Sequence, residues 1–99
     1  MSTAARLPYS VRLRSRRVQR ELDAVSRNDI QRILAAIRAL ANTPRPARSV
    51  RLEGNIFRIR VGRYRVIYQV DDDLRTVNIG GVRRRSEGTY RGIRDLFSN

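Results

Sequence analysis

The apolar residues of this chain follow two different periods along the sequence, and these periods predict where strands and helices lie. Residues 8–14 and 56–61 alternate apolar and polar positions, and this period of two is typical of a strand with one buried face. Residues 64–70 and 75–82 are rich in β-branched and aromatic side chains and are predicted as two further strands. Residues 1–7, which precede the first strand, are predicted to be a flexible tail.

Between the first and second strands, apolar residues recur at steps of three and four residues, which predicts two consecutive helices. Ser15 and Ser26 are placed to cap the N-termini of the first and second helix. The segment 43–46 contains two prolines and is expected to end the second helix. The apolar stripe of the second helix consists of Ile30, Ile33, Leu34, Ile37, Leu40 and Ala41.

The connections between the predicted strands are short. Residues 62–63 form a tight hairpin turn, and three consecutive aspartates at 71–73 form the turn before the last strand. Residues 52–55 are expected to form a turn after a basic loop. The pair Gly80 and Gly81 predicts a bulge or a close approach of another part of the chain to the backbone.

The order of these elements predicts an α+β fold. An N-terminal strand and a helical hairpin precede a three-stranded antiparallel meander, and the helices are expected to pack on one face of an antiparallel sheet. With no linker in the sequence, residues 8–99 are expected to form a single domain. The sequence has no apolar run near the ~20 residues of a membrane span and no apolar segment of a secretion signal, so we expect a cytoplasmic protein without membrane contact.

The net charge of the chain indicates which kind of partner the protein binds. The chain has 22 basic residues, all arginine, against nine acidic ones, which gives a net charge of +13. Base composition of the genome can explain the absence of lysine, but it does not explain the excess of positive charge. Guanidinium groups bind phosphate bidentately and stack on bases, so nucleic acid or an acidic protein is the expected partner.

The residue types that are missing limit the chemistry. The sequence contains no cysteine and no histidine, which excludes disulfides, thiolate metal sites and imidazole acid–base catalysis. The aspartates at 71–73 are expected to be solvated turn residues rather than metal ligands. We therefore expect a protein without metal or cofactor.

One group of residues stands out as candidate chemistry. The predicted hairpin brings Arg58, Arg60 and Arg65 together, and residues 83–85 and Tyr90 follow at the end of the last strand. Several fixed guanidinium groups can hold a phosphodiester and stabilise the charge that develops on its oxygens, and a tyrosine can stack on a base. The competing interpretation is that Arg58 and Arg60 are only the solvent-facing half of an amphipathic strand.

These segments resemble a known family. The run IFRIRVGRYRVIY at 56–68 is similar to the central hairpin of the RelE/ParE toxin superfamily. Residues 42–46, 48–54 and 84–91 resemble the family's helix end, its basic approach to the hairpin and its C-terminal arginine–tyrosine signature. The resemblance extends over residues 9–91.

The resemblance implies a RelE-type toxin of a type II toxin–antitoxin system. Such a toxin is an endoribonuclease that cleaves mRNA in the ribosomal A site, without a metal ion, by attack of the ribose 2′-hydroxyl on the adjacent phosphate. The predicted catalytic residues are Arg58, Arg60, Arg65, Arg84 and Tyr90, and the predicted RNA-binding residues are Arg48, Arg51, Arg83 and Arg85.

The roles of these residues follow from their positions in the family motifs. Arg65 matches the phosphate-stabilising arginine, and Tyr90 matches the tyrosine that stacks on a base or orients the 2′-hydroxyl. Arg84 matches the late active-site arginine, although an alignment shifted by one residue gives this place to Arg85. Arg60 stands where family members often carry lysine as a proposed base. Because arginine is a poor proton acceptor, we expect electrostatic stabilisation to dominate.

The resemblance also implies partners and leaves alternatives open. The expected partners are an acidic antitoxin protein, the ribosome and mRNA, and the resemblance allows a heterotetramer of toxin and antitoxin. A ParE-like toxin of the same fold would instead bind and poison DNA gyrase without cutting nucleic acid. A third alternative is an inactive relative that binds only ribosomal RNA or its antitoxin. The arginine cluster favours cleavage.

Overall fold

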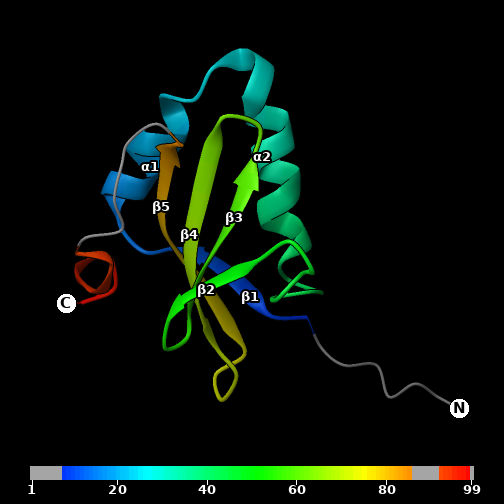
Figure 1. Ribbon diagram of the computed structural model, residues 1–99, viewed down its shortest axis with the longest axis vertical. Helices are drawn as coiled ribbons and strands as arrows, with labels where there is room; N and C mark the ends of the chain where they lie inside the picture. The colour runs from blue at the N-terminus through cyan, green and yellow to red at the C-terminus, as the bar shows by residue number, and fades with distance from the viewer. Residues whose placement is uncertain (1–7, 86–91, 99) are drawn as a thin grey trace, which may run out of the picture.

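Five strands form one mixed sheet, and two helices cover one of its faces (Figure 1). The computed structural model describes residues 8–85 and 92–98. The predicted α+β fold is confirmed. The elements are β1 (Ser10–Leu13), α1 (Arg16–Asp23), α2 (Arg27–Ala39), β2 (Val50–Glu53), β3 (Ile56–Val61), β4 (Tyr64–Asp71), β5 (Thr76–Arg84) and the short 3-10 helix η1 (Ile93–Leu96).

The strand order in the sheet is β1-β5-β4-β3-β2. Strands β3, β4 and β5 form the predicted antiparallel meander. Strand β1 pairs with β5 in the parallel direction, with Ser10 opposite Thr76 and Leu13 opposite Ile79. The prediction of a purely antiparallel sheet is therefore wrong at this edge. Alternation indicates which face of a strand is buried, but it carries no information on the direction in which two distant strands pair.

The turn predicted at residues 52–55 is also partly wrong. Residues Val50–Glu53 form β2, which pairs antiparallel with β3 with a register irregularity between Arg51 and Glu53. Only the end of the predicted segment turns, where Gly54 has a φ of +52°. Val50 is 41% exposed, so this short edge strand lacks the buried alternating positions that identify a strand in a sequence.

The predicted serines do precede the two helices, but neither serine side chain caps a backbone N–H group. The Ser26 hydroxyl instead donates a hydrogen bond to the Asp29 carboxylate, with an oxygen–oxygen distance of 2.8 Å. The backbone N–H of Asp29 donates to the Ser26 carbonyl at 3.0 Å. Thus the two serines correctly marked where the helices begin. At the second helix, the Ser26 hydroxyl bonds to the Asp29 carboxylate and not to a backbone group.

The main core lies between the helices and the sheet. Val18, Ile33 and Leu40 of the helical segment pack against buried residues of β3, β4 and β5. The largest fully buried side chain is Tyr68, whose hydroxyl donates to the Pro44 carbonyl at 2.8 Å. This bond satisfies the polar end of an otherwise apolar side chain and ties β4 to the end of the second helix.

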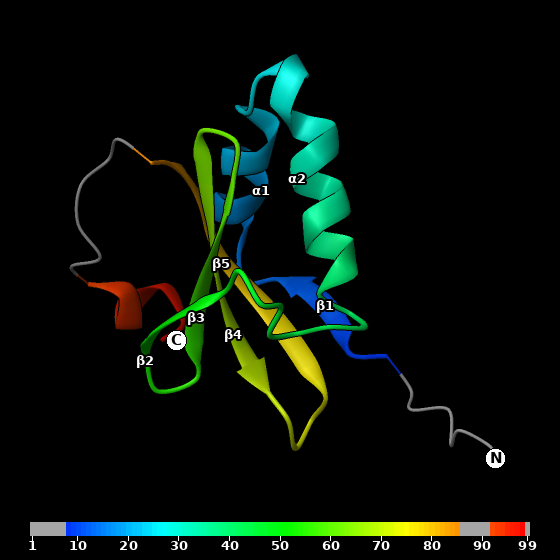
Figure 2. The same ribbon diagram turned by 45° about the vertical axis from the view of Figure 1, so that its right-hand side comes forward.

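A smaller core covers part of the opposite face of the sheet. Ile56 and Ile67 pack there against Ile93 of η1, together with neighbouring residues of the C-terminal segment. Figure 2 shows η1 on one side of the sheet and both long helices on the other. The sheet is therefore covered on both faces where Ile56 and Ile67 lie.

The glycine pair in β5 forms the predicted bulge. Ile67 of β4 lies opposite Gly81, and the next residue of β4 lies opposite Ile79. Gly80 is thus the extra residue. A Cβ atom at Gly80 would lie 2.4 Å from the ring of Phe97, whereas the nearest atom to a Cβ at Gly81 would be 3.5 Å away.

These contacts predict different outcomes at the two glycines. Gly80→Ala is expected to lower the free energy of unfolding by about 1–3 kcal/mol, because the added methyl group displaces the Phe97 ring from the sheet. Gly81→Ala serves as the matched control and is expected to change it by less than about 0.5 kcal/mol. Urea denaturation of both variants measures the difference. Equal destabilisation of both would contradict the assigned contact.

Candidate active site

The strand register places three arginines in one row across the sheet. Arg60 of β3 lies opposite Arg65 of β4, and Arg65 lies opposite Arg83 of β5. Their neighbours in the strands, such as Val66, belong to the core under the helices, so alternation directs the row to the other face. Like charges directly opposite each other destabilise a sheet, so this row is a candidate site for an anion.

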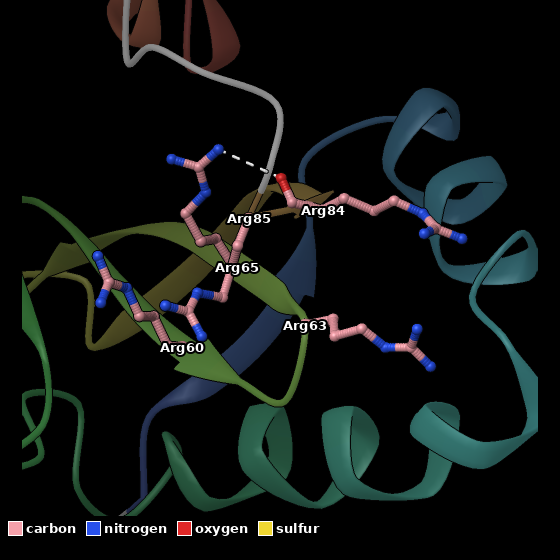
Figure 3. A pocket seen from close by; sticks show the side chains of 5 residues that line it. All are labelled: Arg60, Arg63, Arg65, Arg84 and Arg85. Carbon is pink, nitrogen blue, oxygen red and sulfur yellow. Dashed lines mark hydrogen bonds between the residues drawn. The ribbon is translucent and has the colours of Figure 1, made fainter.

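A pocket of about 370 Å³ lies beside the turn between β3 and β4 and the end of β5. It is lined by Arg60, Arg63, Arg65, Arg84 and Arg85. Figure 3 shows that the side chains of Arg60, Arg65 and Arg85 lie together on one side of the strand ends. The side chains of Arg63 and Arg84 extend the other way, toward the helices. The pocket therefore combines three convergent guanidinium groups with two that point elsewhere.

Arg65 is the most firmly held of the three convergent residues. It lies on the central strand β4 and is only 6% exposed. Its Nη2 donates a hydrogen bond to the Arg84 carbonyl, at a distance of 3.2 Å. A backbone acceptor on the neighbouring strand thus fixes the direction of this guanidinium.

The side chains of Arg84 and Arg85 point to opposite faces of the sheet at the end of β5. The Arg84 guanidinium lies over the ring of Tyr64, 5.8 Å from the ring centroid, and Tyr64 belongs to the core under the helices. The backbone N–H of Arg85 donates to the Arg63 carbonyl at 2.8 Å, which extends the pairing of β4 and β5 beyond the last strand residue. Alternation then returns Arg85 to the face of Arg65. Arg84 contributes its backbone carbonyl to the convergent group, and Arg85 contributes its side chain.

The hairpin also determines where Arg58 and Arg83 lie. Arg58 shares the face of Arg60 but lies opposite Ile67, is half-buried and does not line the pocket. Its Nε atom is buried and has no hydrogen-bond partner among the described residues. The Nε of Arg83 lies 3.7 Å from the carboxylate of Glu21 in α1. Arg83 therefore belongs to the cross-strand row of arginines, but the Glu21 carboxylate partly compensates its charge.

The remaining predicted residues do not join the pocket. The Nη1 of Arg48 donates to the Arg60 carbonyl at 3.3 Å, and the residue lines a different cavity beside α2. The guanidinium of Arg51 lies 5.5 Å from the ring centroid of Phe57, which belongs to the core under the helices. Tyr90 lies outside the described residues. Arg48 and Arg51 are thus absent from the lining of the arginine pocket.

Sequence reasoning missed Arg63, which lines the pocket from the hairpin turn. The signal was present, because Arg63 follows Gly62 in the tight turn that joins the two arginine-bearing strands. Gly62 has a φ of +57°, and a Cβ atom there would lie 2.7 Å from Nη2 of Arg32. The positive φ therefore favours glycine in this turn, whereas a Cβ atom would meet only the flexible end of the Arg32 side chain.

Side chains of α1 hold the strand that carries the late arginines. Arg17 donates to the Gly80 carbonyl at 2.9 Å, and Glu21 accepts a hydrogen bond from the Val82 N–H at 2.9 Å. These two residues also form an ion pair with each other. Strand β1 pairs with β5 only as far as Ile79, so the α1 side chains satisfy the backbone of β5 where strand pairing has ended.

An aspartate at the start of α2 supports the arginine-bearing turn. The Asp29 carboxylate accepts hydrogen bonds from the Ser26 hydroxyl and, at 2.7 Å, from Nη2 of Arg32. These two bonds lower the pKa of Asp29 below its ordinary value of 3.8, and the charge of Arg63 lowers it further. A carboxyl group whose pKa is lowered by folding adds stability that is present above its unfolded pKa and is lost as the pH falls through its folded pKa.

Asp29→Asn is therefore expected to lower the urea midpoint at pH 7. The difference from the wild type should shrink as the pH falls below about 4, where the wild-type carboxylate also takes up a proton. The measurement is urea denaturation at a series of pH values, with Asp23→Asn, an exposed carboxylate of α1, as the control. A difference that stays constant over the whole range would show that the charge of Asp29 is not what stabilises this end of the helix.

The aspartate turn at 71–73 is partly structural rather than fully solvated. The Asp72 carboxylate accepts hydrogen bonds from the Tyr9 hydroxyl at 2.5 Å and from Arg45 at 2.8 Å. Within residues 8–85 and 92–98, no group of three or more histidine, cysteine, aspartate or glutamate side chains is placed to hold a metal ion.

Comparison with known proteins places the chain in a family. Residues 12–88 match the model of the ParE toxin of the type II toxin–antitoxin system, parDE. The chain belongs to this family, and therefore to the RelE/ParE superfamily of type II toxins, and the similar folds below place it with the RelE type. No curated protein sequence matches it significantly. Among the described residues, no helix is long and apolar enough to cross a membrane.

Solved structures show the same fold. A chain of the archaeal RelE–RelB complex of Pyrococcus horikoshii superposes with a TM-score of 0.74 at 26% identity, covering 83% of this chain and all of that one. A chain of the toxin–antitoxin complex RelBE2 of Mycobacterium tuberculosis gives a TM-score of 0.60 at 31% identity over 80% of this chain and all of that one. The isolated Escherichia coli RelE toxin, at 20% identity, gives 0.67 over 89% of this chain and 98% of that one.

Proposed function

We propose that this toxin is a ribosome-dependent endoribonuclease that cleaves mRNA in the A site without a metal ion. The observation that carries the proposal is the convergence of the Arg60, Arg65 and Arg85 side chains at one end of the sheet. Similarity to RelE toxins supports it. We further propose that the protein acts in the cytoplasm.

The arginines would act on the phosphodiester by electrostatics. The ribose 2′-oxygen attacks the adjacent phosphorus and the bond from phosphorus to the 5′-oxygen breaks, which leaves a 2′,3′-cyclic phosphate and a 5′-hydroxyl. Negative charge grows on the non-bridging oxygens during this step, and fixed guanidinium groups stabilise it. Arginine does not accept a proton at working pH, and the sequence has no histidine. The 2′-proton therefore passes to hydroxide or to a Tyr90 phenolate, and water supplies a proton to the 5′-oxygen.

The match to the ParE model favours a second candidate, a toxin that binds and poisons DNA gyrase without cutting nucleic acid. Cleavage ranks first because three convergent guanidinium groups beside a pocket fit a phosphodiester in the course of reaction. A poison that only binds gyrase does not require such a group. An inactive relative that binds ribosomal RNA or antitoxin alone would also lack this requirement.

Two assays on the purified protein separate these candidates. Primer extension on mRNA from translating ribosomes is expected to show new 5′ ends that depend on the toxin, and a gyrase assay is expected to show no accumulation of broken DNA. Arg38→Ala, which changes an exposed arginine of α2, is expected to behave as the wild type in both. Gyrase-linked breaks together with intact mRNA would reverse the ranking, and inactivity in both assays would favour the inactive relative.

The partner that we propose is an acidic antitoxin, in a complex that extends to a heterotetramer. Two of the similar solved structures are the archaeal RelE–RelB complex and the toxin–antitoxin complex RelBE2. A net charge of +13 would attract such a partner over long range, so its association rate is expected to fall steeply between low and high salt. Stopped-flow mixing of toxin and antitoxin at a series of salt concentrations measures this rate. A rate independent of ionic strength would exclude electrostatic steering.

A further inference from the structure

The arginine pocket carries more positive charge than one RNA phosphate can neutralise. Arg60 and Arg85 each direct an exposed guanidinium group to its convergent side, and no acidic side chain is among its lining residues in the described part of the chain. Each phosphodiester of an RNA strand carries a single negative charge. One scissile phosphate therefore neutralises only one of the two charges that Arg60 and Arg85 bring to this side of the pocket.

Arg65 adds a third guanidinium group, whose position is fixed by burial and by a hydrogen bond. Arg65 cannot move into solvent, since it is 6% exposed and its guanidinium donates to a backbone carbonyl on β5. Arg60 and Arg85 lie beside it and are exposed, so their side chains can close over a bound anion. One fixed and two adjustable guanidinium groups can together surround an anion that presents several charged oxygens in a small volume.

We propose that this pocket also binds a compact polyphosphate, the diphosphate or triphosphate group, and that such an anion competes with RNA for the toxin. A diphosphate carries two or more negative charges on two adjoining phosphoryl groups, which can be shared among the three convergent guanidinium groups. A pocket of about 370 Å³ has room for it. The binding stands on the geometry alone, whereas the competition rests on the proposed function of the same pocket.

Isothermal titration calorimetry in magnesium-free buffer at constant ionic strength tests the binding. Inorganic pyrophosphate is expected to bind with one-to-one stoichiometry and about tenfold more tightly than inorganic phosphate, because it gains at least one further charge-assisted hydrogen bond. ATP in a second arm distinguishes the source of the group. Equal affinity for ATP and pyrophosphate means that the phosphates alone are recognised, and tighter binding of ATP means that a nucleotide is the ligand.

Variants matched in charge locate the site. Arg60→Gln and Arg85→Gln are each expected to weaken pyrophosphate binding about tenfold. Arg38→Gln removes the same charge from an exposed position on α2 and is expected to leave the affinity unchanged. Equal weakening by all three variants, or an affinity for pyrophosphate no greater than for phosphate, would overturn the proposal, since binding would then follow net charge alone.

Displacement of a fluorescent single-stranded RNA oligomer by pyrophosphate tests the competition in the same buffer. Displacement is expected in the wild type and is expected to need about tenfold more pyrophosphate in Arg85→Gln. RNA that stays bound while pyrophosphate saturates its site would refute the competition. A toxin that binds pyrophosphate in this pocket but leaves ribosomal mRNA intact would refute the proposed function and not this inference.

Discussion

Arg65→Ala is expected to reduce the single-turnover rate of mRNA cleavage on ribosomes by about 10²–10³-fold, the usual effect of removing one preorganised donor to a developing oxyanion. Arg65 is the one convergent guanidinium that is both buried and fixed in direction, through its hydrogen bond to the Arg84 carbonyl. Its position therefore needs no reorganisation when charge develops on the phosphate. Saturating toxin keeps changes in binding from appearing as changes in chemistry.

The fold is expected to survive this substitution. Arg65 lies between two other arginines in the cross-strand row, so its removal also removes repulsion between like charges. Circular dichroism and urea denaturation measure this independently of activity. Arg65→Lys keeps the charge but loses the planar fork, so it should recover only a small part of the rate. An unfolded Arg65→Ala protein would show that the residue is structural.

Arg85→Ala and Arg84→Ala are expected to differ in activity although the two residues are adjacent. Loss of the Arg85 side chain removes a guanidinium that lies beside Arg60 and Arg65, and we expect the cleavage rate to fall by about 10²-fold. Loss of the Arg84 side chain leaves its backbone carbonyl in place to orient Arg65. We expect a reduction of less than about fivefold for Arg84→Ala, together with a small loss of stability from its contact with Tyr64.

Single-turnover cleavage by the two variants, at equal concentration and saturation, measures the contrast. Both variants carry the same net charge, so a difference between them reports position rather than general attraction to RNA. A larger loss of rate for Arg84→Ala than for Arg85→Ala would mean that the strand end rearranges on the ribosome and that the unshifted family alignment identifies the late arginine.

The sequence by itself determined most of the elements of this fold. A period of two located β1 and β3, and a period of three to four residues located both long helices, because one buried face per element sets these patterns. Strands β4 and β5 are largely buried on both faces, and their β-branched and aromatic residues located them instead. The same pattern missed β2, which buries too little to show alternation, and it left the parallel pairing of β1 with β5 undetermined. The direction of pairing depends on how the helical hairpin carries the chain back across the sheet, which no local pattern records.

The sequence also predicted part of the candidate site, and the tertiary structure decided the rest. Residue type and charge were enough to predict a phosphate-binding group on the hairpin, since no residue other than arginine supplies the positive charge of this chain. Only the tertiary structure decided which arginines meet. Register across β3, β4 and β5 aligned Arg60 with Arg65, and the bulge at Gly80 together with strand alternation placed Arg85, rather than Arg84, beside them. The first pairing lies within the tight hairpin that the sequence predicted, whereas the second joins β5 to β4 across a longer stretch of chain, and packing fixes its register only when the sheet is complete.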